Sequence, residues 1–263
     1  MAFLQGTTIF DYCERGFSPS FWAEPLNALT NGGFILAALV GAAMIAKRPS
    51  HERSLWQIFF VLNFIAIGIG SFLFHTVPNV NTALADTGPI GVFMLTYLIF
   101  ALRRLAGATW LITSLAIAAF IGVIAMAFKM QCWDGQMGFS LDVPPGAEAK
   151  CLNGSLGYGP ALVAMWLIAA WLGIRRRPAA YLIFGAALAF LVSLTFRSLD
   201  QRLCADWVVL GHRMGTHFIW HLLNSLTLFL LLVAAIKYAR HGEQEFCHRI
   251  RSLDHRPMPF HRP

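Results

Sequence analysis

Residues 216–236 read THFIWHLLNSLTLFLLLVAAI, an uncharged stretch long enough to cross a bilayer as a helix. A spanning helix needs roughly 20 mainly apolar residues, because the hydrocarbon core of a bilayer is about 30 Å thick. Hydrophobic residues make up 57% of the 263-residue chain and charged residues only 13%, with a mean hydropathy of +0.60. Soluble domains are typically about one quarter charged. The sequence therefore predicts an integral membrane protein.

Six more stretches of this kind precede it. The seven together are Pro25–Ala46, Leu55–Phe74, Thr87–Leu102, Thr109–Phe128, Leu156–Ile174, Ala179–Phe196 and Thr216–Ile236. The third is short unless Ala83–Ala85 extends it, which would carry Asp86 into the helix. We expect an all-α protein, a seven-transmembrane-helix bundle over residues 25–237. An N-terminal segment, 1–24, precedes the bundle, and a basic tail, 238–263, follows it.

Charge is distributed unequally between the two ends of the bundle. The loops after the first, third and fifth spans, together with the tail, hold 14 basic and 4 acidic residues, whereas the other side holds 6 and 9. The net charges are +10 and −3. Loops rich in Lys and Arg stay cytoplasmic, so we expect the N-terminus outside and the C-terminus in the cytoplasm. Membrane topology also explains the basic pI of about 9.5 without a nucleic-acid partner. The short loops favour a bacterial inner membrane, with the endoplasmic reticulum or Golgi membrane as the alternative.

Four of the five cysteines fall on the predicted outer side, and only Cys247 falls inside. Disulfides persist in oxidising compartments, so two bridges are expected outside and a free thiol inside. Cys132 and Cys151 share one loop and are expected to pair with each other. Cys13 would then bond to Cys204 and tie the N-terminal segment to the loop before the last span. Connectivity does not follow from sequence alone, and four free thiols are the alternative.

Ionisable residues inside the spans are few, and four of them fall at one depth. His75 ends the second span, Asp86 lies near the start of the third, and His217 and His221 lie in the first two turns of the seventh. Residues four apart share a helix face, which places His217 beside His221 and Ser71 one turn from His75. Three histidines with an open fourth position are typical of catalytic zinc. The alternative is a set of structural histidines that bond neighbouring helices.

The chain resembles the alkaline ceramidases, and more broadly the seven-helix membrane hydrolases that include the adiponectin-receptor-like proteins. The resemblance rests on SFLFH at residues 71–75, Asp86 and HFIWH at 217–221, in the order and on the spans of that family. It also rests on DYCE at 11–14 and FWAEPLN at 21–27, just before the first span. Each motif is short, but the combination is specific and reaches from residue 11 to the last span.

The resemblance implies a role for each of these residues. His75, His217 and His221 would be zinc ligands, Asp86 would hold the water of the metal site, and Ser71 would support the developing oxyanion. The expected reaction is the hydrolysis of a lipid amide, most simply ceramide, to a sphingoid base and a fatty acid. A zinc-dependent phospholipase or lipid esterase is one alternative. A seven-helix receptor or sensor with structural zinc is the other.

The resemblance also implies a calcium site in the N-terminal segment. Asp11, Glu14 and Glu24 offer three of the hard oxygen ligands that calcium requires, and the carbonyl of Tyr12 could add a fourth. Gly16 departs from the family pattern, because members can supply a side-chain oxygen there. The alternative is a solvated acidic loop.

Four charged residues near the last two spans have no role in this scheme. Arg197, Asp200, Arg202 and Arg213 are expected to pair with one another, and the alternative is that they meet a substrate headgroup.

Overall fold

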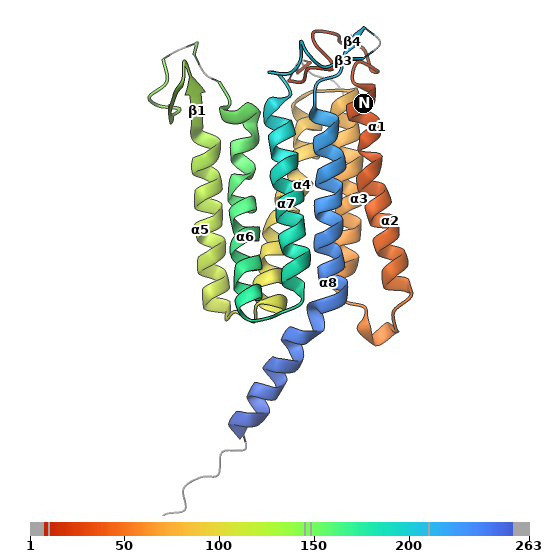
Figure 1. Ribbon diagram of the computed structural model, residues 1–263, viewed down its shortest axis with the longest axis vertical. Helices are drawn as coiled ribbons and strands as arrows, with labels where there is room; N and C mark the ends of the chain where they lie inside the picture. Colours follow the sequence, from red (N-terminus) through yellow and green to blue (C-terminus); the bar gives the residue numbers. More distant parts are fainter. Residues whose placement is uncertain (1–7, 10, 145, 148, 210, 255–263) are drawn as a thin grey trace, which may run out of the picture.

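The computed structural model describes residues 8–254 except 10, 145, 148 and 210, with side chains up to residue 239. This part of the chain contains seven helices long and apolar enough to cross a membrane (Figure 1). The predicted all-α seven-helix bundle is confirmed.

Each predicted span coincides with a helix, although the third begins earlier and the seventh ends later than predicted. In chain order they are α1 and α2 (Pro25–Thr30 and Gly32–Ala46), α3 (Leu55–Thr76), α4 (Val80–Phe100), α5 (Trp110–Lys129), α6 (Gly159–Ile174), α7 (Ala179–Leu199) and α8 (His217–Asp254). The π-helix η3 (Ala101–Leu105) prolongs α4, and the 3-10 helix η4 (Cys151–Tyr158) leads into α6. The connections hold the 3-10 helix η2 (Ser50–Glu52), a hairpin of β1 and β2 (Met130–Trp133 and Gln136–Phe139) and a hairpin of β3 and β4 (Val208–Val209 and His212–Arg213).

The third span begins earlier than its apolar stretch suggested. The side chain of Asn79 accepts hydrogen bonds from the backbone N–H groups of Asn81 and Thr82, and the Thr82 hydroxyl accepts from the Asn79 N–H. This reciprocal cap starts α4 at Val80 instead of Thr87. The helix therefore includes Asp86. This agrees with the expectation that Ala83–Ala85 could extend the third span.

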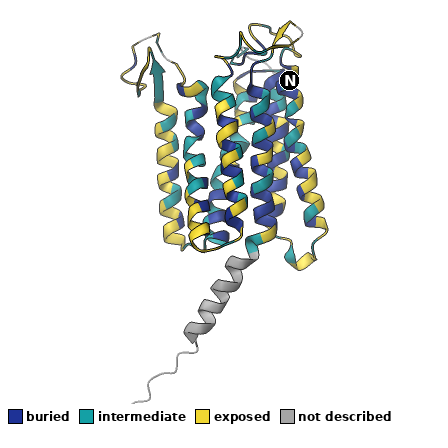
Figure 2. Cartoon of the chain, in the orientation of Figure 1, coloured by how far each residue is buried: buried dark blue, intermediate teal, exposed yellow. Residues whose placement is uncertain are grey.

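Burial differs strongly between the helices. Of the seven spans, α8 and α3 are the most buried and α5 is the most exposed (Figure 2). Large apolar side chains are exposed on the outer helices, among them Leu36, Leu39, Leu111, Leu115 and Leu167. Such surfaces are unfavourable in water but suit contact with lipid. The two helices that carry the three histidines are thus the most buried of the seven spans.

A glycine allows α3 and α4 to approach closely near the candidate site. A Cβ atom on Gly70 would lie only 2.0 Å from the carbonyl oxygen of Ala85 and 3.2 Å from the backbone nitrogen of Asp86. Real Cβ atoms do not tolerate such distances, so only glycine fits at position 70 without movement of the backbone. This contact places Asp86 of α4 against the end of α3 that holds Ser71.

Both expected disulfides are present in the structure. Cys13 bonds to Cys204 and Cys132 bonds to Cys151. They lie at the end of the bundle that holds the N-terminal segment and both hairpins, at the top of Figure 1. The last part of α8 leaves the opposite end of the bundle. The side chain of Cys247, predicted to be free, lies outside the described residues.

Candidate metal centre

The three predicted histidines come together in the core of the bundle. His75 lies in the last turn of α3, while His217 and His221 occupy successive turns at the start of α8. One ring nitrogen from each lies within 4.8 Å of the others, and all three residues are at most 2% exposed. In the described part of the chain, they form the one group of three or more potential metal ligands.

Two of the imidazoles are oriented by contacts on their outer side. Nδ1 of His75 lies 2.6 Å from Oε2 of the buried Glu24. Nδ1 of His221 lies 3.0 Å from the hydroxyl of Thr30, which donates its own hydrogen to the carbonyl of Leu26 at 2.7 Å. Both contacts therefore favour a proton on Nδ1, because a carboxylate and an already donating hydroxyl can only accept. Such outer partners fix the tautomer of a metal-bound histidine and leave Nε2 for the ion.

The inner side of the cluster lacks hydrogen-bond partners. Neither Nε2 of His75 nor Nδ1 of His217 has a partner among the described residues, although both atoms are buried. Leaving such an atom unpaired costs about 1–3 kcal/mol. Three buried imidazoles, two of which have an unsatisfied ring nitrogen, fit a metal ion that prefers nitrogen ligands.

Ser71 and Asp86 lie beside the histidines, as predicted. Both line a cavity together with His217 and His221. We call it the polar cavity; its other walls are Tyr12, Phe34, Ile67, Ile90, Tyr158, Arg197, Trp220 and Asn224. A carboxyl group, a hydroxyl group and a potential metal centre thus face one space.

A second, apolar cavity adjoins the first. The two share Ile67, Ile90, Tyr158 and Asn224 as lining residues. Along α8 the apolar cavity reaches Leu231, ten residues beyond His221, which corresponds to about 15 Å of helix. Its remaining walls are mainly aliphatic and aromatic side chains of α4, α6 and α7. This space suits a hydrocarbon chain that extends inward from the histidines.

The N-terminal segment covers the histidines from outside the bundle. The Tyr12 ring packs on His217, with 3.9 Å between the ring centroids, and lies 5.0 Å from that of His75. Tyr12 itself is only 8% exposed. Its ring thus shields the polar cavity, whereas the sequence had assigned only its carbonyl, as a calcium ligand. That carbonyl accepts a hydrogen bond from the N–H of Gly16 at 3.3 Å.

Each of the three carboxylates predicted to bind calcium contacts different groups of the protein. Asp11 contacts Nζ of Lys150 at 3.0 Å. Glu14 accepts the backbone N–H groups of Leu26 and Asn27 at 2.8 and 2.9 Å, at the start of α1. Burial raises the pKa of Glu14, and these N–H groups oppose the shift. Asp11 and Glu14 thus each contact groups of the protein, and the calcium site stays a prediction.

Glu24, the third of these carboxylates, is almost fully enclosed by the protein. Besides His75, it contacts Nδ2 of Asn27 at 3.0 Å and the guanidinium of Arg15. Burial acts to raise the pKa of Glu24, but hydrogen bonds from His75, Asn27 and Arg15 outweigh it and the pKa is lowered. Glu24 thus serves the histidine cluster as an ionised carboxylate.

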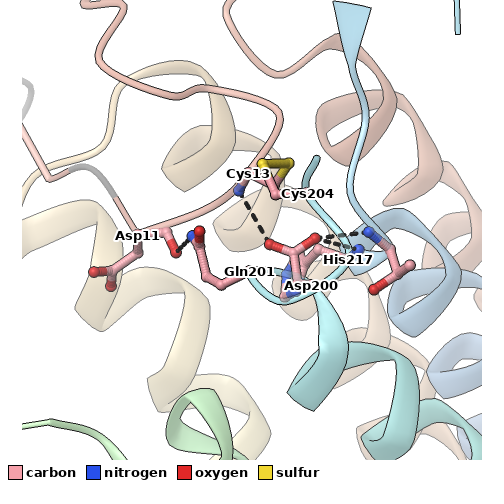
Figure 3. Close-up of a disulfide and its surroundings, with 7 residues drawn as sticks. Asp11, Cys13, Asp200, Gln201, Cys204 and His217 are labelled. Carbon is pink, nitrogen blue, oxygen red and sulfur yellow. Dashed lines mark hydrogen bonds between the residues drawn. A yellow bond between two sulfur atoms is a disulfide. The ribbon is translucent and has the colours of Figure 1, made fainter. Parts of the chain in front are cut away.

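Asp200 has a different role from the predicted ion pair. Its carboxylate accepts the backbone N–H groups of Thr216 and His217, at 2.7 and 2.9 Å, and that of Cys13 at 3.0 Å (Figure 3). Burial raises the pKa of Asp200, and these N–H groups oppose the shift. The first two contacts cap α8 at the turn that carries His217, where a negative group is favourable. The prediction that Asp200 pairs with a neighbouring arginine was therefore wrong.

Arg197 also departs from that prediction. Its guanidinium donates to the carbonyl of Asn153 at 2.7 Å and lies over the rings of Tyr158 and Trp220. All three of Arg197, Tyr158 and Trp220 line the polar cavity. The geometry agrees with the alternative, that Arg197 meets the polar part of a substrate.

The sequence did not reveal Arg15, Thr30 or Asp200 as parts of the site. Their contacts join residues 60, 191 and 17 positions apart, for Arg15 with His75, Thr30 with His221 and Asp200 with His217. A short motif carries no signal for such contacts.

Comparison with known families agrees with this geometry. The sequence model of the ceramidase family matches residues 5–140. The chain belongs to the ceramidase family. Membership supports a ceramide-hydrolysing membrane enzyme, a hydrolase that acts on amides. No curated protein matches the chain. The family match includes Ser71, His75 and Asp86, and the structure brings His217 and His221, which lie beyond the matched residues, next to them.

Proposed function

We propose that this ceramidase-family chain is a zinc-dependent intramembrane amidohydrolase that converts ceramide to a sphingoid base and a fatty acid. One observation carries the proposal. Two histidines of the buried cluster, His217 and His221, line one cavity with Ser71 and Asp86, and an apolar cavity adjoins it. In this proposal, His75, His217 and His221 hold the metal.

Zinc fits this set of ligands. It binds imidazole nitrogen and, in catalytic sites, keeps three protein ligands and one open position. When bound, it supplies a Lewis acid that lowers the pKa of water towards about 7 and polarises a carbonyl group. Glu24 and Thr30 would hold two of the imidazoles in the tautomer that such binding requires.

Asp86 is proposed to move the proton. Its carboxylate would take a proton from the attacking water and pass it to the amide nitrogen as the C–N bond breaks. The water oxygen would bond to the carbonyl carbon, so that the products are a carboxylic acid and an amine.

Ser71 is proposed to act at the same moment as Asp86. Both side chains line the polar cavity. The Ser71 hydroxyl would donate to the developing oxyanion while Asp86 holds the proton. Donors that meet charge mainly in the transition state increase the rate more than those that bind the ground state.

The two cavities suggest how the lipid lies. One hydrocarbon chain would fill the apolar cavity, and the amide would lie at its junction with the polar cavity. Arg197 and Tyr158, which line the polar cavity, are placed to contact the polar end of the substrate. A closed, mainly apolar site with a few converging polar groups is typical of small-molecule sites.

The alternatives make different demands on the site. A structural zinc site normally closes its shell with a fourth protein ligand, whereas the described residues offer three. The receptor interpretation is therefore less well supported. Ester hydrolysis would use the same residues, so a phospholipase or lipid esterase is distinguished by substrate alone.

The test is metal analysis of the purified full-length protein, together with turnover of ceramide and of an acyl ester. We expect about one zinc per chain and ceramide hydrolysis in the parent, and loss of both in His217→Ala. The exposed residue His51 provides the control, because His51→Ala should change neither. Stoichiometric zinc without hydrolysis of either lipid would favour the receptor interpretation, and turnover of the ester alone would favour the esterase.

A further inference from the structure

Arg15 is a fully buried cation that the proposed reaction does not use. Its side chain is 0% exposed. Nε donates to Oε1 of Glu24, and one terminal nitrogen donates to the carbonyls of Ser18 and Ser20 at 3.0 Å each. The other terminal nitrogen donates to the carbonyl of His75 at 2.8 Å. Arginine is almost never buried unless it is paired, and here every contact joins the N-terminal segment to itself or to the end of α3.

Glu24 links Arg15 to the histidine cluster. One carboxylate oxygen contacts Arg15, and the other contacts Nδ1 of His75 and Nδ2 of Asn27. A buried carboxylate without a cation would be strongly unfavourable. Arg15 therefore lies where it can hold the Glu24 carboxylate in place against His75.

The contacts of Arg15 also resemble those of a bound cation. A carboxylate oxygen and three backbone carbonyls surround the guanidinium. Carboxylates and carbonyls are the ligands that calcium takes in proteins. Glu24, a predicted calcium ligand, thus faces the positive charge of Arg15, a residue of the same chain. Unlike a metal ion, the guanidinium is present at any calcium concentration, since arginine keeps its proton at all ordinary pH values.

We propose that Arg15 is the built-in cation of the N-terminal segment, a positioning residue that holds Glu24 on His75 and makes calcium unnecessary there. The inference rests on the proposed metal-binding role of His75. It concerns how tightly the site holds zinc, and it assigns Arg15 no contact with the substrate.

The first test measures zinc affinity in the full-length protein by competition with a chelator. Loss of an outer partner of a metal-bound histidine typically weakens metal binding 10–100-fold. We expect a weakening of about that size in Arg15→Ala and in Glu24→Gln. The double variant should bind zinc no more weakly than the single variant with the lower zinc affinity. Both changes break the same linkage, from Arg15 through Glu24 to His75. Arg202→Ala is the matched control, since Arg202 is exposed in the loop that follows α7.

Two outcomes of this test would overturn the proposal. One is an Arg15→Ala protein that binds zinc as tightly as the parent. The other is a double variant whose loss is the product of the two single losses, because the residues would then act independently.

The second test uses the parent protein and needs no variant to fold. Metal analysis after purification in calcium-containing buffer should find no stoichiometric calcium. The Tm should be the same in excess calcium and in a calcium chelator. One bound calcium per chain, or a Tm that rises with calcium, would contradict the proposal. If the parent protein held no zinc, that result would contradict the proposed function. The calcium measurement would still test the proposed role of Arg15.

Discussion

At the scale of the residue, binding of the metal and movement of the proton are proposed to use different side chains. Asp86 lines the polar cavity together with Ser71, whereas the proposed ligand set consists only of imidazoles. We therefore expect Asp86→Asn to keep its zinc but to lose turnover by about 10²–10⁴-fold, the usual value of general acid–base help. The measurement is ceramide turnover normalised to zinc content. A variant with full zinc and undiminished hydrolysis would rule out the assigned role of Asp86.

The residues of the site differ in how well the sequence predicted them. His217 and His221 are four apart on one apolar helix, so their pairing follows from helix geometry alone. Asp86 was found because ionisable groups in spans are costly and few, and Ser71 because it lies four residues before His75 on the same helix face. Arg15 and Asp200 could not be found in this way. Apart from the Glu24 carboxylate, their partners are backbone carbonyls or N–H groups brought near by the fold.

At the scale of the element, the close approach of α3 and α4 holds the catalytic pair together. Gly70→Ala would place a Cβ atom 2.0 Å from the Ala85 carbonyl, so α4 must move. Overpacking of this kind costs about 1–3 kcal/mol and sometimes more. We expect a lower Tm and a loss of turnover in Gly70→Ala, because the displacement separates Asp86 from Ser71.

Gly91→Ala is the matched control on the same pair of helices. Nothing lies within 4 Å of a Cβ atom at Gly91, and alanine is the better helix former by about 0.5–1 kcal/mol. Its Tm and turnover should equal or exceed those of the parent. If Gly70→Ala behaved like this control, the tight contact would not be what positions Asp86.

The seven spans could be predicted from the sequence, but not all of their first and last residues. The chain is less apolar on the N-terminal side of Thr87, yet the cap at Asn79 starts α4 at Val80. Hydropathy measures what lipid tolerates, whereas a helix begins where its first N–H groups find partners. Seven spans could thus be predicted from composition, while the start of α4 depended on one polar side chain.

At the scale of the whole molecule, the end that holds the disulfides is proposed to face outward. Both disulfides lie at the end that holds the N-terminal segment, and the basic loops belong to the opposite end. A cysteine placed at Thr8 should react with an impermeant thiol reagent on intact cells, whereas one placed at His255 should not. The measurement needs a Cys247→Ser background to remove the native thiol. The reverse labelling pattern would contradict this orientation.

The central claim is that three imidazoles hold a zinc ion whose fourth position is open to water. X-ray absorption at the zinc edge of the purified protein tests it most directly. The account predicts three nitrogen neighbours and one oxygen neighbour at about 2.0–2.1 Å, with imidazole scattering and no sulfur. A protein without zinc, a sulfur neighbour at about 2.3 Å or a fourth imidazole would contradict it.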